Sequence, residues 1–250
     1  MIEEAAVISN RVVAQNTFVT RFHSPEVART ARPGQFVMVS FPECLDPLLA
    51  RAFSVSDVHG EDFSLLYSAV GKGTTRLSRL KRGAIAAING PLGNGFPEVE
   101  RGENIWLVVG GSGAAIVPIV FKSARRAGAA LKIFYGAKTK LQIVAFKKIQ
   151  FYAATDDGSA GHHGTVLDLL NIHFRKEKPS KIFGCGPTAM LAALKKNIDT
   201  DVPLYISVET PMACGMGFCQ GCPVKVVDSS EYLLACKNGP VFDAREIDLE

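Results

Sequence analysis

The sequence predicts a multi-domain chain of the β plus α/β class: an N-terminal antiparallel β-barrel, a doubly wound parallel sheet and a small cysteine-rich C-terminal module. Short apolar runs separated by turn formers fill the first part of the chain. Strand-like and helix-like runs alternate in the middle, and four of the six cysteines lie close together near the end. The length of 250 residues suits two compact domains and a small third one, with expected boundaries at 1–98, 99–208 and 209–250.

The first domain is predicted from six strand-like runs separated by turn formers such as Pro33-Gly34 and His59-Gly60. Short strands at this spacing are typical of a closed barrel or a sandwich. The breaker-rich segment Gly90–Pro97 predicts the end of the domain. The runs are Ala6–Val13, Thr17–Phe22, Gly34–Phe41, Ala52–Val58, Asp62–Val70 and Gly83–Asn89.

From Ile105 onward, strands alternate with helices, which predicts a parallel sheet with helices on both faces. Pro187 stands at the start of a predicted helix, where its missing N–H does no harm. The predicted strands are Ile105–Val109, Leu131–Tyr135, Gln150–Ala154, Lys181–Phe183 and Val202–Val208. The predicted helices run from the glycines at 110–113 to about Arg126, over Thr165–Asn171 and over Thr188–Asn197.

Charge and composition exclude several classes of function. The formal net charge of +4 is small and the basic residues form no long run, so we expect no nucleic-acid partner. The acidic start Met1–Ala5 lacks the features of a signal peptide, and no apolar run approaches the ~20 residues that span a bilayer. We therefore expect a cytoplasmic protein without membrane contact, whose thiols stay reduced.

Four cysteines have the spacing of an iron–sulfur site. Cys214, Cys219, Cys222 and Cys236 give C-x4-C-x2-C-x13-C, and the first three match the plant-type 2Fe–2S pattern. Glycines between them let the backbone bend and let amide N–H groups point at sulfur. The C-terminal module is therefore predicted to be an iron–sulfur module. A structural zinc site, which usually has two C-x2-C pairs, and four unrelated buried thiols are the alternatives.

Two glycine-rich junctions follow predicted strands and open predicted helices. The first contains Gly110, Gly111 and Gly113, and the second is Gly184–Pro187. Backbone N–H groups at such junctions hold phosphate, and two of them at the carboxyl ends of parallel strands predict a dinucleotide site. The first junction is not a complete G-x-G-x-x-G motif, so a plain tight turn is the alternative there.

Two acidic residues, Asp156 and Asp157, follow the predicted strand Gln150–Ala154. Carboxylates at such a strand end accept hydrogen bonds from a ribose 2′-hydroxyl and repel a 2′-phosphate, which favours NAD over NADP. Solvated loop carboxylates are an equally good interpretation.

In the barrel, the segment Arg51–Ser54 combines a guanidinium, an aromatic ring and a hydroxyl. Arg51 is suited to bind a pyrophosphate with two hydrogen bonds, and Ser54 to bond a flavin ring. The glycine-rich segment Gly71–Thr74 offers further amides to phosphate. An ordinary strand end and an ordinary turn are the alternatives.

Together these motifs resemble the ferredoxin-reductase-like flavoprotein superfamily and, more narrowly, the electron-transfer subunits of type B dihydroorotate dehydrogenase. The resemblance covers essentially the whole chain and is most specific in the tail, above all in Cys236–Phe242. The other segments that carry it are Arg51–Ser54, Tyr67–Ala69, Gly73-Thr74, Gly90–Phe96, Gly110–Gly113, Thr155–Ser159 and Gly184–Pro187.

The resemblance implies a barrel that binds FAD, a middle domain that binds NAD(H) and a C-terminal module that holds a 2Fe–2S cluster on the four cysteines of the tail. It places Cys185 near the nicotinamide, with a buried structural thiol as the alternative. By motif match, the residues expected to contact FAD are Arg51, Ala52, Phe53, Ser54, Tyr67, Ser68, Ala69, Gly73 and Thr74.

The implied function is an electron relay in pyrimidine biosynthesis. A flavin-containing catalytic partner subunit, in a hetero-oligomer taken as a heterotetramer, oxidises dihydroorotate, and the electrons pass through this chain to NAD⁺. One alternative is the small subunit of an NADH-dependent ferredoxin:NADP oxidoreductase, a sister family that tends to carry Asp at the position of Cys214. A free-standing NADH reductase and a non-enzymatic iron–sulfur sensor are the others.

Overall fold

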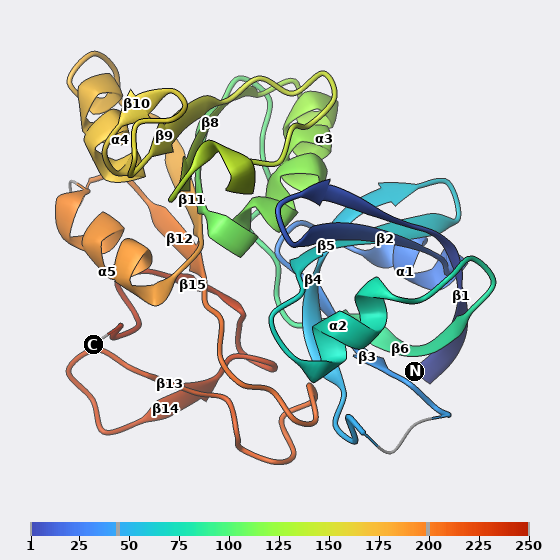
Figure 1. Cartoon of the computed structure of the whole chain (residues 1–250). Coiled ribbons are helices and arrows are strands. Elements are labelled where there is room, and N and C mark those ends of the chain that lie inside the picture. The colour runs from blue at the N-terminus through green and yellow to red at the C-terminus, as the bar shows by residue number, and fades with distance from the viewer. Residues whose placement is uncertain (1, 44–45, 199–200, 250) are drawn as a thin grey trace.

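A computed structural model describes residues 2–43, 46–198 and 201–249, so Cys44 lies outside the described residues. A β-barrel and a largely parallel sheet lie side by side, and the C-terminal segment runs along the lower side of the sheet and reaches the barrel (Figure 1). The predicted fold class is confirmed. The domain boundaries at 98/99 and 208/209 stay predictions.

The barrel strands pair antiparallel in the order β1-β2-β5-β4-β3-β6, and β1 pairs with β6 to close the barrel. Helix α1 (Pro25–Thr30) connects β2 to β3, and helix α2 (Lys72–Ser78) connects β5 to β6. The strands are β1 (Ile2–Ala14), β2 (Thr17–His23), β3 (Phe36–Ser40), β4 (Arg51–His59), β5 (Asp62–Ser68) and β6 (Ile85–Leu92).

Strand β3 joins the barrel to the rest of the molecule, because successive side chains of a strand point to opposite faces. Val37 and Val39 belong to the barrel core. Phe36 and Met38 belong to a second core, which contains residues of the parallel sheet and of the C-terminal segment. Part of the contact between the barrel and the other two parts therefore lies on the outer face of β3.

In the described part of the chain, the second sheet has the order β10-β9-β8-β7-β11-β12-β15. Neighbours are parallel except β15, which the C-terminal segment adds antiparallel to β12. The strands are β7 (Asn104–Gly110), β8 (Ala130–Ala137), β9 (Tyr152–Thr155), β10 (His162–His163), β11 (Lys181–Cys185), β12 (Leu204–Ser207) and β15 (Val241–Asp243). A separate hairpin pairs β13 (Pro223–Lys225) with β14 (Tyr232–Leu234).

Helices cover both faces of this sheet, as predicted. Apolar side chains of α3 (Val117–Ala127) share a core with the barrel, and those of α4 (Val166–Phe174) and α5 (Thr188–Asn197) pack in the second core. The glycine-rich junction after β7 forms a 3-10 helix, η1 (Gly111–Ile116), before α3, and η2 (Lys140–Gln142) follows β8. None of the described helices is both long and apolar enough to cross a membrane.

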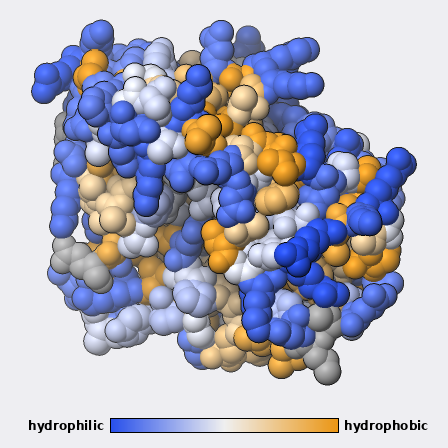
Figure 2. All heavy atoms as spheres, in the orientation of Figure 1, coloured by the Kyte–Doolittle hydropathy of each residue, from blue (hydrophilic) through white to orange (hydrophobic). Residues whose placement is uncertain are grey.

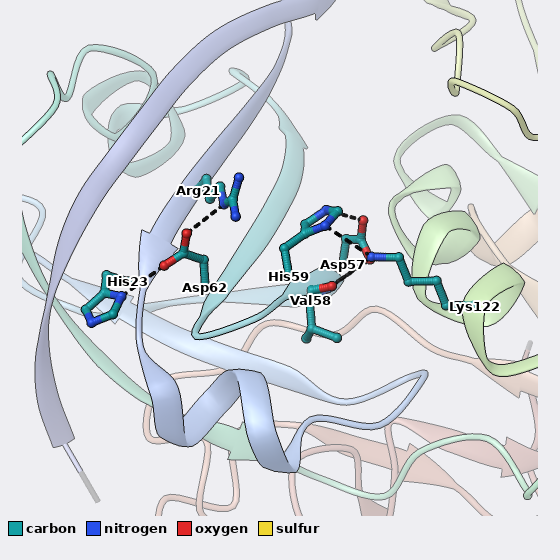
Figure 3. A network of polar contacts seen from close by, with 7 residues as sticks. All are labelled: Arg21, His23, Asp57, Val58, His59, Asp62 and Lys122. Atoms are coloured by element: carbon teal, nitrogen blue, oxygen red, sulfur yellow. Dashed lines mark hydrogen bonds and ion pairs between the residues drawn. The ribbon is translucent and has the colours of Figure 1, made fainter. Parts of the chain in front are cut away.

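A polar network fastens α3 to the barrel (Figure 3). Lys122 Nζ lies 2.6 Å from Asp57 Oδ1 and donates to the Val58 carbonyl at 2.7 Å. His59 Nε2 lies 2.6 Å from the other oxygen of Asp57, whose side chain is only 13% exposed. A largely buried carboxylate needs its partners, so Lys122 fixes the orientation of the sheet domain on the barrel.

Replacing Lys122 by Met keeps most of the aliphatic stem and removes the charge. We expect the free energy of unfolding to fall by about 1–3 kcal/mol, because Asp57 and the Val58 carbonyl lose a charged donor. Urea denaturation measures this change. Arg125→Met, at an exposed position of the same helix, is the matched control. Equal stabilities of the two variants would contradict the role given to Lys122.

Candidate functional site

A cleft of about 470 Å³ lies between the barrel and the carboxyl edge of the sheet. On the face that Figure 2 shows, apolar residues gather in the middle, between the sheet and the barrel. Seven residues singled out in the sequence line this cleft, from both walls: Ala52, Phe53, Ser54, Tyr67, Ser68, Thr74 and Cys185. The fold thus brings the motif Arg51–Ser54, the motif Tyr67–Ala69 and the second glycine-rich junction to one place.

The barrel wall of the cleft is aromatic. The rings of Phe53 and Tyr67 meet edge to face with centroids 5.3 Å apart. The Tyr67 hydroxyl lies 2.9 Å from the hydroxyl of Thr20, and burial raises the pKa of Tyr67 to about 12. The phenol therefore stays neutral and held inside the barrel, which leaves a flat apolar surface for a planar ring.

Arg51 lies beside the start of α2. An added Cβ on Gly73 would lie 2.9 Å from Arg51 Cγ, so these two predicted residues are in contact. The guanidinium donates to the carbonyls of Leu49 and Ala50, at 2.6 and 3.2 Å. Arg51 and Gly73 therefore border the cleft without lining it. A bound pyrophosphate would have to replace the two carbonyl contacts.

Thr74 and Ala69 make contacts that shape the loop beside the cleft. The hydroxyl of Thr74 accepts from the N–H groups of Val70 and Gly71, at 2.9 and 3.0 Å. The amide of Gly71, expected to face phosphate, is thus already used. Ala69 pairs through its backbone with Asn16. Both contacts fix the loop between β5 and α2, which borders the cleft.

Two buried polar atoms next to the cleft lack a hydrogen-bond partner among the described residues. Thr210 Oγ1 belongs to a residue of the cleft wall, and Arg76 Nε to a residue of a neighbouring hollow of about 620 Å³. That hollow is also lined by Lys72 and Arg79, beside one carboxylate, Asp46. Buried polar groups are normally hydrogen-bonded. These donors and this positive charge fit a polar, phosphate-bearing ligand such as FAD.

On the sheet wall, Cys185 is almost completely buried. Burial raises the pKa of its thiol to about 12, and the carboxylate of Glu209 adds to the shift. The thiol is therefore neutral at physiological pH, and its chemistry is that of a small wall group rather than a nucleophile. An added Cβ on Gly113 would lie 2.1 Å from the Cys185 carbonyl oxygen, so the predicted glycine is needed for close packing here.

Glu209 and Thr210 are residues of the cleft that no sequence motif indicated. Burial raises the pKa of Glu209, and the Ser112 hydroxyl lies 3.4 Å from its carboxylate. Because the Glu209 side chain still reaches solvent, its pKa shift contributes little to the free energy of unfolding. The available signal was their position directly after a predicted strand, where ligands of parallel sheets bind.

A second hollow of about 330 Å³ adjoins the cleft and shares Ser68 and Ser112 with it. Gly111, Tyr135 and Gln142 line it from the sheet side. It therefore lies at the carboxyl ends of β7 and β8, where a dinucleotide would extend from the cleft.

Three further predicted residues stand apart from this hollow. Gly110 packs against Pro187 and Met190 instead of lining it. Asp156 and Asp157 follow β9, are exposed and line neither the hollow nor the cleft. Asp157 Oδ1 accepts from the Ser159 amide and hydroxyl, at 2.9 and 2.6 Å. These bonds hold the pKa of Asp157 below its usual value, so it is ionised.

The four cysteines of the tail lie in two pairs. Cys222 Sγ and Cys236 Sγ are 3.2 Å apart and buried, whereas Cys214 and Cys219 lie nearer the surface. The amides of Met216 and Cys219 donate to Cys214 Sγ at 3.4 and 3.5 Å. Mainly for this reason the pKa of Cys214 falls to about 6, which favours the thiolate that binds metal.

In the other pair, burial and then the Cys222 thiol raise the pKa of Cys236 to about 12. Within residues 2–43, 46–198 and 201–249, no three His, Cys, Asp or Glu side chains come close enough to share one metal ion. A cluster with two irons needs two thiolates on each iron, which the two pairs supply.

Comparisons with known proteins agree with this geometry. A family model described as the iron–sulfur cluster binding domain of dihydroorotate dehydrogenase B matches residues 209–248. The dihydroorotate dehydrogenase B (NAD⁺) electron transfer subunit of Desulforamulus reducens is 36% identical over 254 residues, which cover 98% of this chain and 97% of the relative. The subunit of the same name from Clostridium acetobutylicum is 38% identical over 222 residues, 86% of each chain.

A solved structure of the NADH-dependent reduced ferredoxin–NADP oxidoreductase is 31% identical, with a TM-score of 0.87 over 98% of this chain and 90% of that one. The two relatives named above are matched over 97% and 86% of their length and carry one name. The cluster-binding segment matches the same family. The chain therefore belongs to the family of dihydroorotate dehydrogenase B electron-transfer subunits.

Proposed function

We propose that this chain relays electrons from a catalytic partner subunit, which oxidises dihydroorotate, through a 2Fe–2S cluster and FAD to NAD⁺ in pyrimidine biosynthesis. One observation carries the proposal. A single cleft is lined by six of the nine predicted FAD residues of the barrel, by Cys185 of the sheet, and by Met212 and Pro240, which flank the four cysteines. This lining supports a relay in which the flavin, the nicotinamide and the cluster lie close to one another.

In this proposal the barrel holds the flavin. Phe53 and Tyr67 provide the flat wall and Ser54 a hydrogen-bonding hydroxyl, while Arg51 and the basic hollow beside α2 bind the phosphates. FAD suits this junction because it exchanges electrons singly with a cluster and in pairs, as hydride, with a nicotinamide. The chain itself would bind and orient the flavin and exclude water from it.

The sheet domain would hold NAD(H) with its nicotinamide at the cleft. Cys185, neutral and buried, gives the ring a small uncharged neighbour. The hollow lined by Gly111, Tyr135 and Gln142 would take the rest of the dinucleotide. Asp156 and Asp157 would then lie near the adenosine ribose, at the end of the adjacent strand β9.

The partner is expected to be a flavin-containing dehydrogenase subunit that supplies the base for dihydroorotate. The cytoplasm is the location we propose, because the cluster ligands must stay reduced and the five described cysteines are free thiols. The second candidate, the small subunit of an NADH-dependent ferredoxin:NADP oxidoreductase, is favoured by the TM-score of 0.87. Cys214 supports the first candidate, the dihydroorotate dehydrogenase subunit. It completes a thiol pair with Cys219, at a position where the sister family tends to carry Asp.

NADH should reduce the bound flavin about 5- to 30-fold faster than NADPH, since repulsion between a carboxylate and a 2′-phosphate near the surface is worth on the order of 1–2 kcal/mol. Stopped-flow reduction of the isolated holoprotein with each nucleotide measures the preference. Asp156→Asn should reduce it, and Asp228→Asn, an exposed Asp in the tail, is the control. Equal rates with both nucleotides would remove Asp156 and Asp157 from nucleotide selection.

A further inference from the structure

The segment that follows Cys236 makes several contacts with one residue, Asn94, which lies just after the barrel strand β6. The Asn94 amide N–H donates to the Gly239 carbonyl at 2.6 Å. Its side-chain Nδ2 donates to the carbonyl of Asn238 at 2.8 Å and, more weakly, to that of Lys237 at 3.4 Å. Asn94 also forms an isolated parallel bridge with Pro240. One residue therefore fastens four consecutive residues of the tail.

The barrel side of this contact is fixed. Gln35, which directly precedes β3, donates through Nε2 to the Gly93 carbonyl at 2.8 Å. Gly93 has a φ of +73°, and a Cβ there would lie 2.6 Å from Pro240 Cδ. A side chain at position 93 would therefore not fit between the barrel and the tail. Gly93, the neighbour of Asn94, is thus held by Gln35, and the next residue along the chain, Phe36, lines the cleft.

The tail side of the contact is equally well defined. The amide of Leu234 donates to Asn238 Oδ1 at 2.9 Å, and the amide of Asn238 donates back to the Leu234 carbonyl at 2.8 Å. Cys236 lies inside this closed turn, and its Sγ accepts from the Gly217 amide at 3.1 Å. A shift of Asn238 would therefore move the Cys236 thiol with it.

We propose that Asn94 is a positioning residue that fixes the cluster relative to the flavin site. Cys236 stands at one end of the segment that Asn94 binds, and Pro240, which lines the cleft, at the other. The cluster loop also touches the barrel, since an added Cβ on Gly215 would lie 2.6 Å from Met38 Cγ. Electron transfer depends steeply on the separation and orientation of the two centres, so the contact sets its rate. This inference rests on the proposed function.

The test compares holoprotein carrying Asn94→Ala or Asn94→Asp with the wild type. The first variant removes the side-chain donor, and the second keeps its shape but turns a carboxylate toward the carbonyls of Lys237 and Asn238. Both keep the four cysteines, so iron, sulfide and FAD per chain should stay at wild-type values. Asn197→Ala is the matched control, because that amide bonds a carbonyl within α5.

We expect a changed electron paramagnetic resonance spectrum of the dithionite-reduced cluster in both variants, a readout that needs neither NADH nor a partner. After rapid reduction of the flavin by NADH, electron exchange with the cluster should be slower in both variants than in the wild type, because the rate falls as the two centres move apart or turn away from each other. Wild-type spectra and exchange rates in both variants would overturn the proposal, as would loss of the cluster from both. Failure of NADH to reduce the wild-type flavin would instead refute the proposed function.

Discussion

The Cys219→Ser protein is expected to contain no iron or sulfide while its FAD content stays at the wild-type value. Cys219 and Cys214 form the exposed thiol pair, and the Cys219 amide donates to Cys214 Sγ at 3.5 Å. A serine hydroxyl does not ionise at neutral pH, so one iron would lose a ligand. The predicted flavin residues lie on the barrel, outside the cluster loop.

Iron, acid-labile sulfide and flavin per chain measure this outcome directly. Sulfide in the wild type also separates a cluster from the zinc site that the cysteine spacing left open. Cys185→Ser is the matched control, since it replaces a free thiol outside the four and should keep full iron. Full iron and sulfide in the Cys219→Ser protein would refute the ligand assignment.

Arg51→Ala is expected to weaken FAD binding by about 1.5–3 kcal/mol, or roughly 10- to 150-fold in Kd, the range for a hydrogen bond to a charged group. The guanidinium stem packs beside Gly73, at the edge of the cleft and next to the basic hollow lined by Lys72 and Arg76. The side chain is thus within reach of a phosphate bound on either side of the start of α2. Its loss also exposes the Leu49 and Ala50 carbonyls.

Titration of apoprotein with FAD, followed by flavin fluorescence, gives the affinity. Arg82→Ala removes an exposed guanidinium from the turn between α2 and β6 and should bind FAD as the wild type does. An unchanged affinity of the Arg51→Ala protein would place the pyrophosphate elsewhere on the barrel, with Arg76 as the next residue to replace.

The sequence alone was sufficient to predict a site whose residues lie close together in the chain. The spacing of Cys214, Cys219 and Cys222 within one loop predicted an iron–sulfur site, and the structure brings Cys236 to it. The barrel strands and the alternating sheet followed from apolar runs separated by turn formers or by helix-like segments. The two shortest strands of the sheet, β10 and β15, were not predicted, since two or three residues carry no period.

What the sequence did not reveal are contacts between distant segments. Glu209 and Thr210 enter the cleft only because β12 ends beside the barrel. Asn94 binds Asn238, which lies 144 residues further along the chain. The glycines after β7 were expected to open the helix, yet they form η1, where Gly113 packs on Cys185. Asp156 and Asp157 end β9 as expected, but no described cleft reaches them.

The most direct test of the relay follows NADH formation from dihydroorotate and NAD⁺, first with this chain alone and then with its catalytic partner. The account predicts no turnover with the chain alone, although the chain should oxidise NADH with an artificial acceptor. Adding the partner should give dihydroorotate-dependent NADH formation, and the Cys219→Ser chain should fail to support it. Turnover by the chain alone would contradict the subunit assignment, and full activity of the cluster-free variant would contradict the electron path.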